Sequence, residues 1–161
     1  MDARLDYTAS PTARKAMGHL LGAHHVVQEA LPASLLELVS LRVSLINGCA
    51  VCVDMHVKEA AAAGETPVRL ALVGAWREAT VFTEAERAAL ELAEQGTRTA
   101  DAGEGVDEGV WARAARHFDD EQLAALVMHV AFMNMVNRLN IITRQPATGD
   151  YVAGQLAAQA H

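Results

Sequence analysis

The sequence predicts an all-α protein. Helix start and stop signals recur from one end of the chain to the other, and no segment combines period-two alternation with an enrichment in β-branched residues. The chain has 161 residues, of which 52% are hydrophobic and 20% are charged, so it can bury a substantial core. We therefore expect a single domain over residues 1–161 that contains about six to seven helices.

Proline, glycine and capping residues divide the first half of the chain into four expected helices. Ser10-Pro11 supply a cap and a first-turn proline, and Pro32 opens the next helix. Asn47-Gly48 and Gly64 are typical of helix ends, whereas Thr66-Pro67 are typical of a helix start. These helices are expected over residues 11–30, 32–47, 48–63 and 67–76.

The second half of the chain carries two further capping signals. Thr83 and Glu86 have the spacing of a capping box, and Gln122 can complete a similar cap in the last helix. Residues 97–105 are polar and contain glycine, which predicts a loop, and the Ala-, Gly- and Gln-rich tail over residues 145–161 is expected to be only partly ordered. Helices are expected over residues 84–96, 107–117 and 119–142.

Charge and hydropathy exclude several classes of partner. The formal net charge is -7, the sequence pI is near 5.4, and no cluster of Lys and Arg is present, so nucleic acid is not an expected partner. The N-terminus is acidic and lacks the apolar core of a signal peptide, and no stretch approaches the length of a membrane-spanning segment. We expect a cytoplasmic protein without a membrane partner.

Both cysteines of the chain lie in one short motif with a histidine. At about 100° per residue, the side chains of Cys49, Cys52 and His56 fall within about one sixth of a helix circumference. A position in the first helical turn favours a thiolate over a thiol, so at least one cysteine is expected to be acidic. This pattern suits a reaction in which one sulfur attacks, the other resolves and the imidazole moves a proton.

Two other interpretations of the motif remain open at this stage. The cysteines can be a pair of small buried hydrophobic residues, or they can join His56 in binding zinc. Structural zinc normally takes its ligands from two separated clusters, and the second cluster is absent, so we expect no metal and no cofactor. His19, His24 and His25 have poor ligand spacing and are expected to be surface or boundary histidines.

The helix before the motif contains one carboxylate, Glu37. Projected on a helix, Glu37 shares a narrow polar stripe with Ser40 and Ser44, and most of the remaining circumference is apolar. A helix of this kind is expected to be buried on most sides. Glu37 then either faces a strip of solvent or points into a site.

The run from Glu37 to Gly64, ELVSLRVSLINGCAVCVDMHVKEAAAAG, resembles the core of the carboxymuconolactone decarboxylase superfamily. More narrowly it resembles the alkylhydroperoxidase branch of AhpD-like proteins, which carry a glutamate, a Cys-x-x-Cys motif twelve residues later and a histidine four residues after that. The resemblance extends to Asn137-Arg138-Leu139-Asn140 and covers about residues 30–144.

This resemblance implies an all-helical protomer that assembles into a homo-oligomer, either a trimer or a hexamer. It also implies an antioxidant peroxidase in which Cys52 attacks a hydroperoxide, Cys49 resolves the product, and Glu37 and His56 form a proton relay. An external dithiol would then restore the pair. The alternatives are a general dithiol–disulfide oxidoreductase and a non-enzymatic, oligomeric redox sensor.

The chain departs from the family at the position between the cysteines. The best studied members carry histidine there and many relatives carry tyrosine, whereas this chain has Val51, which neither donates nor accepts a proton. Any relay that uses this position is absent here. Lactone decarboxylation is not expected either, because that branch lacks the paired cysteines.

Overall fold

The computed structural model describes residues 2–103 and 105–155, and over these residues the chain is all-helical, as predicted. It contains eight α-helices rather than the expected six to seven. They are α1 (Pro11–Gln28), α2 (Ala33–Asn47), α3 (Ala50–Ala62), α4 (Pro67–Leu72), α5 (Glu84–Thr97), α6 (Thr99–Ala102), α7 (Glu108–Ala114) and α8 (Asp120–Thr143), with short 3-10 helices η1 (Tyr7–Ala9) and η2 (Val73–Ala75).

The additional helix, α6, occupies part of the stretch expected to be a loop. It has only four residues and follows α5 almost directly, with Arg98 between them. A helix of one turn is too short to show the hydrophobic periodicity that predicts helices, and its polar residues are typical of a loop. The capping box of Thr83 and Glu86 at the start of α5 is confirmed, and so is that of Asp119 and Gln122 at the start of α8.

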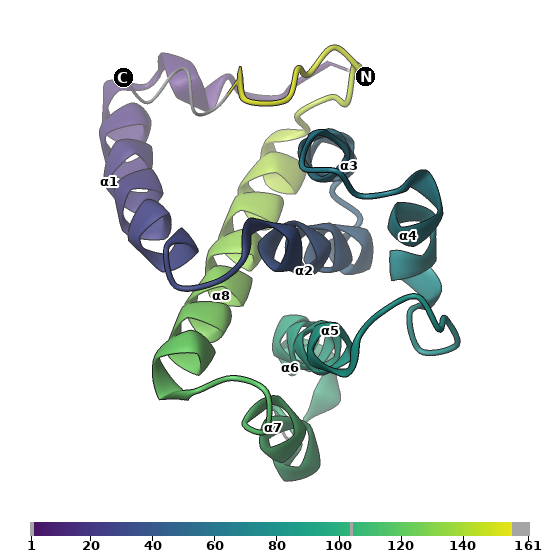
Figure 1. Cartoon of the computed structure of the whole chain (residues 1–161). Helices are drawn as coiled ribbons and strands as arrows, with labels where there is room; N and C mark the ends of the chain where they lie inside the picture. Colours follow the sequence, from purple (N-terminus) through teal and green to yellow (C-terminus); the bar gives the residue numbers. More distant parts are fainter. Residues whose placement is uncertain (1, 104, 156–161) are drawn as a thin grey trace.

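Helix α2 lies at the centre of the molecule and packs against α3, α5 and α8 (Figure 1). Leu38, Val39 and Val43 are fully buried, because each side of the helix meets a different neighbour. The apolar circumference that the sequence shows for this helix therefore corresponds to burial on most sides, as expected. Because α2 is surrounded by α3, α5 and α8, the few polar side chains of α2 lie between helices.

Helix α8 is the longest helix and contacts α1, α2 and α5 (Figure 1). By length and composition alone it could cross a membrane, which contradicts the expectation that no stretch approaches that length. A central helix that packs against several neighbours has the same composition, and α8 also carries buried polar side chains. Part of its surface remains apolar and exposed, at Val127, Met128 and Ile142.

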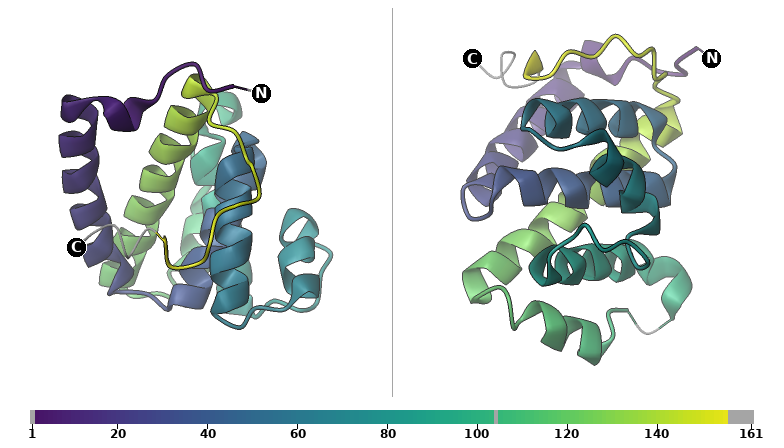
Figure 2. Two further views of the ribbon diagram at one scale, coloured as in Figure 1. Left: turned by 90° about the horizontal axis from the view of Figure 1, so that it is seen from above. Right: turned by 45° about the vertical axis from the view of Figure 1, so that its right-hand side comes forward.

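The segments at both ends of the described chain cross the same side of the helices (Figure 2). The backbone N–H of Arg4 donates to the carbonyl of Thr143 at 2.8 Å, and the side-chain amide of Gln145 donates to the carbonyl of Leu5 at 2.8 Å. These bonds fasten the N-terminal segment to the C-terminal end of α8.

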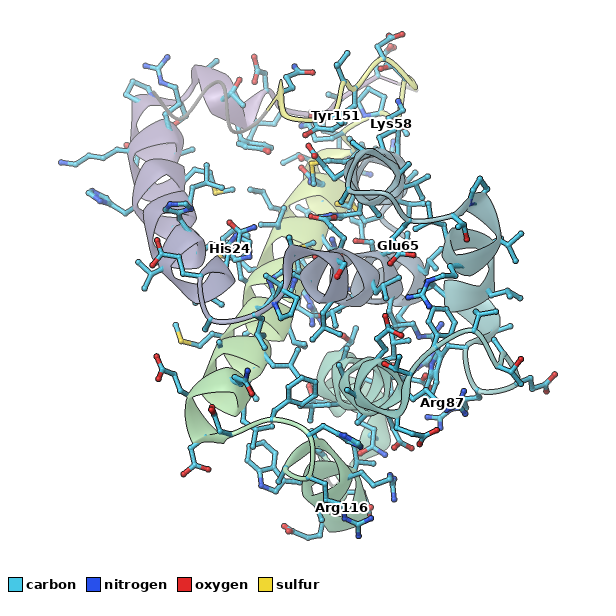
Figure 3. The ribbon with its side chains drawn as sticks, viewed as in Figure 1. His24, Lys58, Glu65, Arg87, Arg116 and Tyr151 are labelled. Carbon is cyan, nitrogen blue, oxygen red and sulfur yellow. A yellow bond between two sulfur atoms is a disulfide. The ribbon has the colours of Figure 1, made fainter. Side chains whose placement is uncertain are left out.

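The C-terminal tail then runs along α3, where Tyr151 lies beside Lys58 in Figure 3. Lys58 donates to the carbonyl of Gly149, and the Tyr151 hydroxyl donates to the carboxylate of Glu59. Part of the tail that was expected to be only partly ordered thus contacts the helix that carries the cysteine motif. The rest of that tail, residues 156–161, lies outside the described residues.

Candidate active site: a cysteine pair beside a glutamate and a histidine

The cysteine motif lies at a sharp turn between α2 and α3. Gly48 ends α2 with φ 73°, a left-handed conformation that glycine adopts without steric cost. The side-chain amide of Asn47 donates to the amide oxygens of Asn134 and Asn137 on α8, both at 3.0 Å, and so anchors the turn. Cys49 follows as the N-cap of α3, one residue earlier than the first-turn position expected from the sequence.

Cys49 and Cys52 are joined by a disulfide, with their Cα atoms 5.3 Å apart. Each residue is only 1% exposed. Because Cys49 adopts an extended conformation at the cap and Cys52 lies in the first helical turn, the two side chains meet across that turn. The local backbone therefore brings the sulfur atoms within bonding distance, as reversible thiol–disulfide chemistry requires.

The start of α3 supplies a favourable field for a thiolate. The first amides of a helix have no intrahelical acceptors, and α3 lacks a side-chain cap that would occupy them. Cys52 lies within this turn, where the positive end of the helix dipole stabilises negative charge. The structure thus places Cys52 in the electrostatic setting that the sequence indicates.

Glu37 and His56 form a hydrogen bond between α2 and α3. The carboxylate Oε2 and the ring Nδ1 lie 2.8 Å apart, and the two side chains are 18% and 8% exposed. The carboxylate of Glu37 thus reaches the motif helix. An Nδ1 proton donated to Glu37 leaves the lone pair of a neutral imidazole on Nε2.

The other ring nitrogen of His56, Nε2, is buried and has no hydrogen-bond partner among the described residues. A buried nitrogen without a partner is uncommon in folded proteins, and a catalytic role is one explanation for it. His56 lies one helical turn after Cys52 on α3. The ring is therefore held by Glu37 through Nδ1, and its Nε2 is not engaged by another side chain among the described residues.

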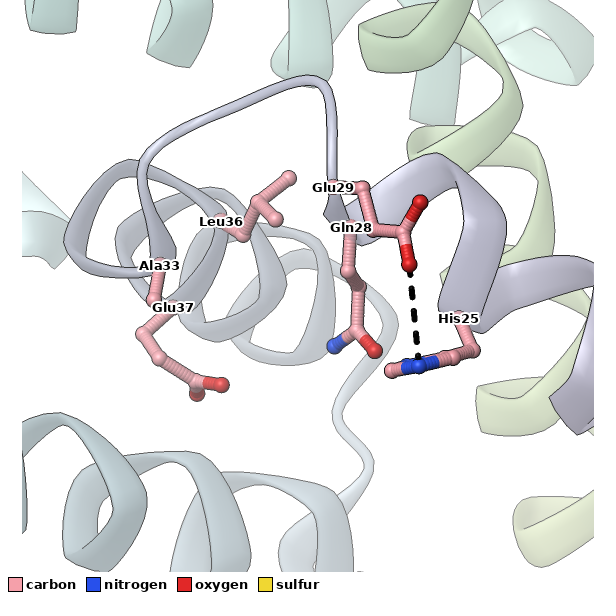
Figure 4. A pocket seen from close by; sticks show the side chains of 6 residues that line it. All are labelled: His25, Gln28, Glu29, Ala33, Leu36 and Glu37. Atoms are coloured by element: carbon pink, nitrogen blue, oxygen red, sulfur yellow. Dashed lines mark ion pairs between the residues drawn. The ribbon is translucent and has the colours of Figure 1, made fainter.

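A hollow of about 280 Å³ opens beside Glu37, between the end of α1 and the start of α2 (Figure 4). Gln28 and the ion pair of His25 with Glu29 stand on its α1 side. Ala33 and Leu36 supply apolar lining from α2. Glu37 therefore lies between the buried ring of His56 and a space connected to solvent.

Asn140 on α8 also belongs to this site, and the sequence reasoning did not assign it a role. Its amide Nδ2 donates to the Sγ of Cys52 at 3.3 Å, and its Oδ1 accepts a hydrogen bond from the Tyr7 hydroxyl at 3.3 Å. The only sequence signal was a polar residue at the end of an apolar helix, within the quoted segment Asn137 to Asn140.

A second buried histidine, His129, bonds to Ser40 in the same polar stripe of α2 that carries Glu37. His129 on α8 is 1% exposed and hydrogen bonds to His24 at 2.9 Å and to Ser40 at 2.8 Å. Burial, reinforced by repulsion from His24 and His56, lowers the pKa of His129 to about 3. Burial and the same kind of repulsion lower the pKa of His24, labelled in Figure 3, to about 4. Both rings are neutral at pH 7.

Within residues 2–103 and 105–155, no three His, Cys, Asp or Glu side chains converge as metal ligands do. His19, His24 and His25 do not form a cluster, and the ring of His24 turns toward α8, where it stacks on Phe132. Thus no ligand set for the zinc alternative is formed in this part of the chain.

An all-helical fold with a buried Cys-x-x-Cys pair, placed beside a glutamate–histidine pair, defines a class of helical proteins with a dithiol site. The chain belongs to the carboxymuconolactone decarboxylase family, whose model matches residues 10–95. It is 34% identical over 135 residues to the uncharacterised protein YdfG of Bacillus subtilis, covering 84% of this chain and 89% of that one.

Solved structures agree with this assignment. A protein of unknown function from Agrobacterium tumefaciens, described as a candidate antioxidant defence protein AhpD, is 34% identical and superposes with a TM-score of 0.83 over 90% of this chain and 97% of that one. An alkylhydroperoxidase AhpD core protein from Ralstonia eutropha shares the fold at 20% identity, with a TM-score of 0.70 over 83% of this chain and 70% of that one.

Proposed function

We propose that this protein is a thiol-dependent hydroperoxidase that turns over through the Cys49–Cys52 pair. The observation that carries the proposal is the pairing of a disulfide at a helix start with a histidine that a partly buried carboxylate orients. The 34% identity to a protein described as a candidate AhpD supports the same activity. The external reductant is a dithiol.

The reaction begins with the thiolate of Cys52, which attacks the outer oxygen of a hydroperoxide. The O–O bond breaks, an alcohol leaves after taking up a proton, and Cys52 becomes a sulfenic acid. The thiol of Cys49 then attacks this sulfur, which forms the disulfide and releases water. The external dithiol reduces the disulfide and is itself oxidised to a disulfide, so two electrons pass from the dithiol to the peroxide.

Glu37 and His56 move the protons in this scheme. Nε2 of His56 takes the proton from the Cys52 thiol, and the imidazolium that forms is stabilised by the carboxylate of Glu37 at 2.8 Å. The ring then returns the proton to the leaving alkoxide. Protons exchange with solvent through the hollow beside Glu37. This path replaces proton transfer by the residue between the cysteines, which Val51 cannot perform.

A general dithiol–disulfide oxidoreductase is the second candidate. Val51 favours it, since the side chain between the two cysteines cannot assist protonation of the alkoxide that leaves a peroxide. Thiol–disulfide exchange has a thiolate as its leaving group and makes less demand on such a proton donor.

Incubation with cumene hydroperoxide and a dithiol tests these alternatives. A hydroperoxidase consumes peroxide over many turnovers, whereas a disulfide oxidoreductase reduces a model disulfide and leaves the peroxide. A redox sensor gives one stoichiometric oxidation. Lack of turnover with alkyl hydroperoxides under saturating dithiol would overturn the proposal. Metal analysis of the purified protein tests the zinc alternative in parallel.

The same proposal includes a homo-oligomer, either a trimer or a hexamer. Only 33% of the most apolar stretch of α8 is buried within the protomer. Apolar surface is exposed on this helix at Val127, Met128 and Ile142. Exposed apolar surface of this kind is typical of an interface between subunits. Sedimentation equilibrium measures the mass directly, and a monomer at micromolar concentration would exclude this assembly.

A further inference from the structure

The amide of Asn140 contacts the sulfur atom that the proposed reaction uses first. Asn140 lies in the last turns of α8, and 88 positions in the sequence separate it from Cys52. Its Nδ2 is 3.3 Å from the Sγ of Cys52, a distance typical of a hydrogen bond to sulfur. Asn140 is therefore a side-chain hydrogen-bond donor that reaches this sulfur from a helix other than α3.

The second atom of the same amide group is also occupied. The hydroxyl of Tyr7 lies 3.3 Å from the Oδ1 of Asn140. A thiolate accepts hydrogen bonds and cannot donate them, so the NH₂ group of the amide must face the sulfur and the oxygen must face Tyr7. Tyr7 can donate to that oxygen, since burial, reinforced by the charge of Asp6, raises the pKa of its hydroxyl.

The N-terminal segment holds Tyr7 in place. Asp6 caps η1 by accepting from the backbone N–H of Thr8 at 2.9 Å. Just before Asp6 in the chain, Arg4 donates to the end of α8 and Leu5 accepts from Gln145, which follows α8. Tyr7 is therefore fixed over Asn140 by contacts that do not involve the cysteines.

We propose that Asn140 is a catalytic residue that stabilises the thiolate of Cys52, and that Tyr7 is a positioning residue that orients the Asn140 amide. The inference rests on the proposed function, in which Cys52 is the attacking sulfur. When the disulfide is reduced, the hydrogen bond from Nδ2 to Sγ becomes charge-assisted and therefore stronger. It adds to the field of the α3 dipole and lowers the pH at which Cys52 ionises.

The test is a titration of the thiolate absorbance at 240 nm in reduced protein that lacks the other thiol. The parent variant carries Cys49→Ala, because serine at this N-cap could itself accept from the first-turn amides. In this parent, Asn140→Leu is expected to raise the titration midpoint by about one pH unit, the shift for loss of one hydrogen bond to a charged group. Asn140→Asp is expected to raise it further, since a carboxylate would face the thiolate.

Tyr7→Phe removes only a hydroxyl and keeps the amide, so it guards against a general loss of structure. It is expected to raise the midpoint by less than Asn140→Leu does, because the amide can then rotate. Tyr151→Phe is the matched control, because the Tyr151 hydroxyl bonds to Glu59. The midpoint of the Cys52 titration in this variant should equal that of the parent. Thermal unfolding of each variant shows that it is folded.

An unchanged midpoint in both folded Asn140→Leu and Tyr7→Phe would overturn the inference. The titration contains no peroxide, so its outcome is separate from that of the proposed function. If the protein fails to reduce hydroperoxides but the midpoints shift as expected, the proposed reaction falls and the role of Asn140 stands. If turnover is found and the midpoints do not shift, the role of Asn140 falls alone.

Discussion

The carboxylate of Glu37 holds the ring of His56 by a hydrogen bond of 2.8 Å that joins the central helix to the helix of the cysteines. Removing the negative charge with Glu37→Gln should make Cys52 harder to ionise, since the imidazolium that receives its proton loses its counterion. We expect the pH profile of the iodoacetamide reaction rate to shift upward. Glu29→Gln, on the other side of the same hollow, is the control. An unchanged profile for Glu37→Gln would remove this residue from the relay.

The two cysteines should give different products when each is replaced. Cys52→Ser is expected to abolish both turnover and trapping of a sulfenic acid by dimedone, because the attacking sulfur is lost. Cys49→Ser is expected to leave a trappable sulfenic acid at Cys52 that cannot close to a disulfide. Mass spectrometry of the dimedone adduct distinguishes the two, and the reverse pattern would exchange the assigned roles.

The hydrogen-bonded pair of His24 and the buried His129 should make the fold sensitive to acid. Both folded-state pKa values are lowered from 6.5, to about 4 and about 3, chiefly by burial. The unfolded chain therefore binds protons that the folded chain does not as the pH falls below 6.5, and the free energy of unfolding decreases over that window, down to about pH 4. Urea unfolding between pH 7 and pH 4.5 should show this loss.

His129→Gln should make that pH dependence shallower, by up to about 1.4 kcal/mol per pH unit, the value for one proton. His19→Gln, at an exposed position of α1, serves as the control and should leave the slope as it is. If the free energy of unfolding has the same pH dependence in the His129 variant and the unmodified protein, the pKa of His129 is not lowered by folding.

Glu94 on α5 should matter more for stability than Glu91, three residues earlier. Glu94 accepts from Arg42 at 2.7 Å and from Trp76 at 3.1 Å, and both the Arg42 and Glu94 side chains are largely buried. Burial raises the pKa of Glu94, but the bonds from Arg42 and Trp76 outweigh it, so the pKa is lowered. Glu94→Ala would leave the largely buried charge of Arg42 without its carboxylate partner, at a cost of about 3 kcal/mol.

Glu91→Ala is the comparison for this prediction. Glu91 pairs with Arg77 and Arg113, whose side chains are 51% and 48% exposed, and such pairs contribute about 1 kcal/mol or less. Denaturant titration of the two variants measures the difference. Equal losses would show that the Arg42–Glu94 pair behaves as a surface pair.

The parts of the fold that local chemistry determines were predictable from the sequence. Capping boxes lie within four residues, and the spacing of Cys49, Cys52 and His56 lies within three turns of one helix, so both can be read directly. Glu37 was assigned through the family resemblance, since its contact with His56 crosses between two helices.

The rest of the site depends on distant contacts that no periodicity encodes. Tyr7 and Asn140 are 133 positions apart, and their meeting requires that the N-terminal segment be bound to the end of α8. The hydrogen bond between His24 and His129 likewise joins α1 to α8 across 105 positions. Such pairs become visible only once the helices are packed.

The order in which the chain is made gives the contact between Cys52 and Asn140 a further meaning. Translation completes the cysteine motif 88 residues before it reaches the amide that will cover it, so the nascent polypeptide carries uncovered sulfur while the later helices are still being added. An oxidant encountered then finds only two cysteines in the whole sequence, three positions apart. Premature oxidation within the chain can form only the native pairing, and newly made protein is thereby spared scrambled disulfides.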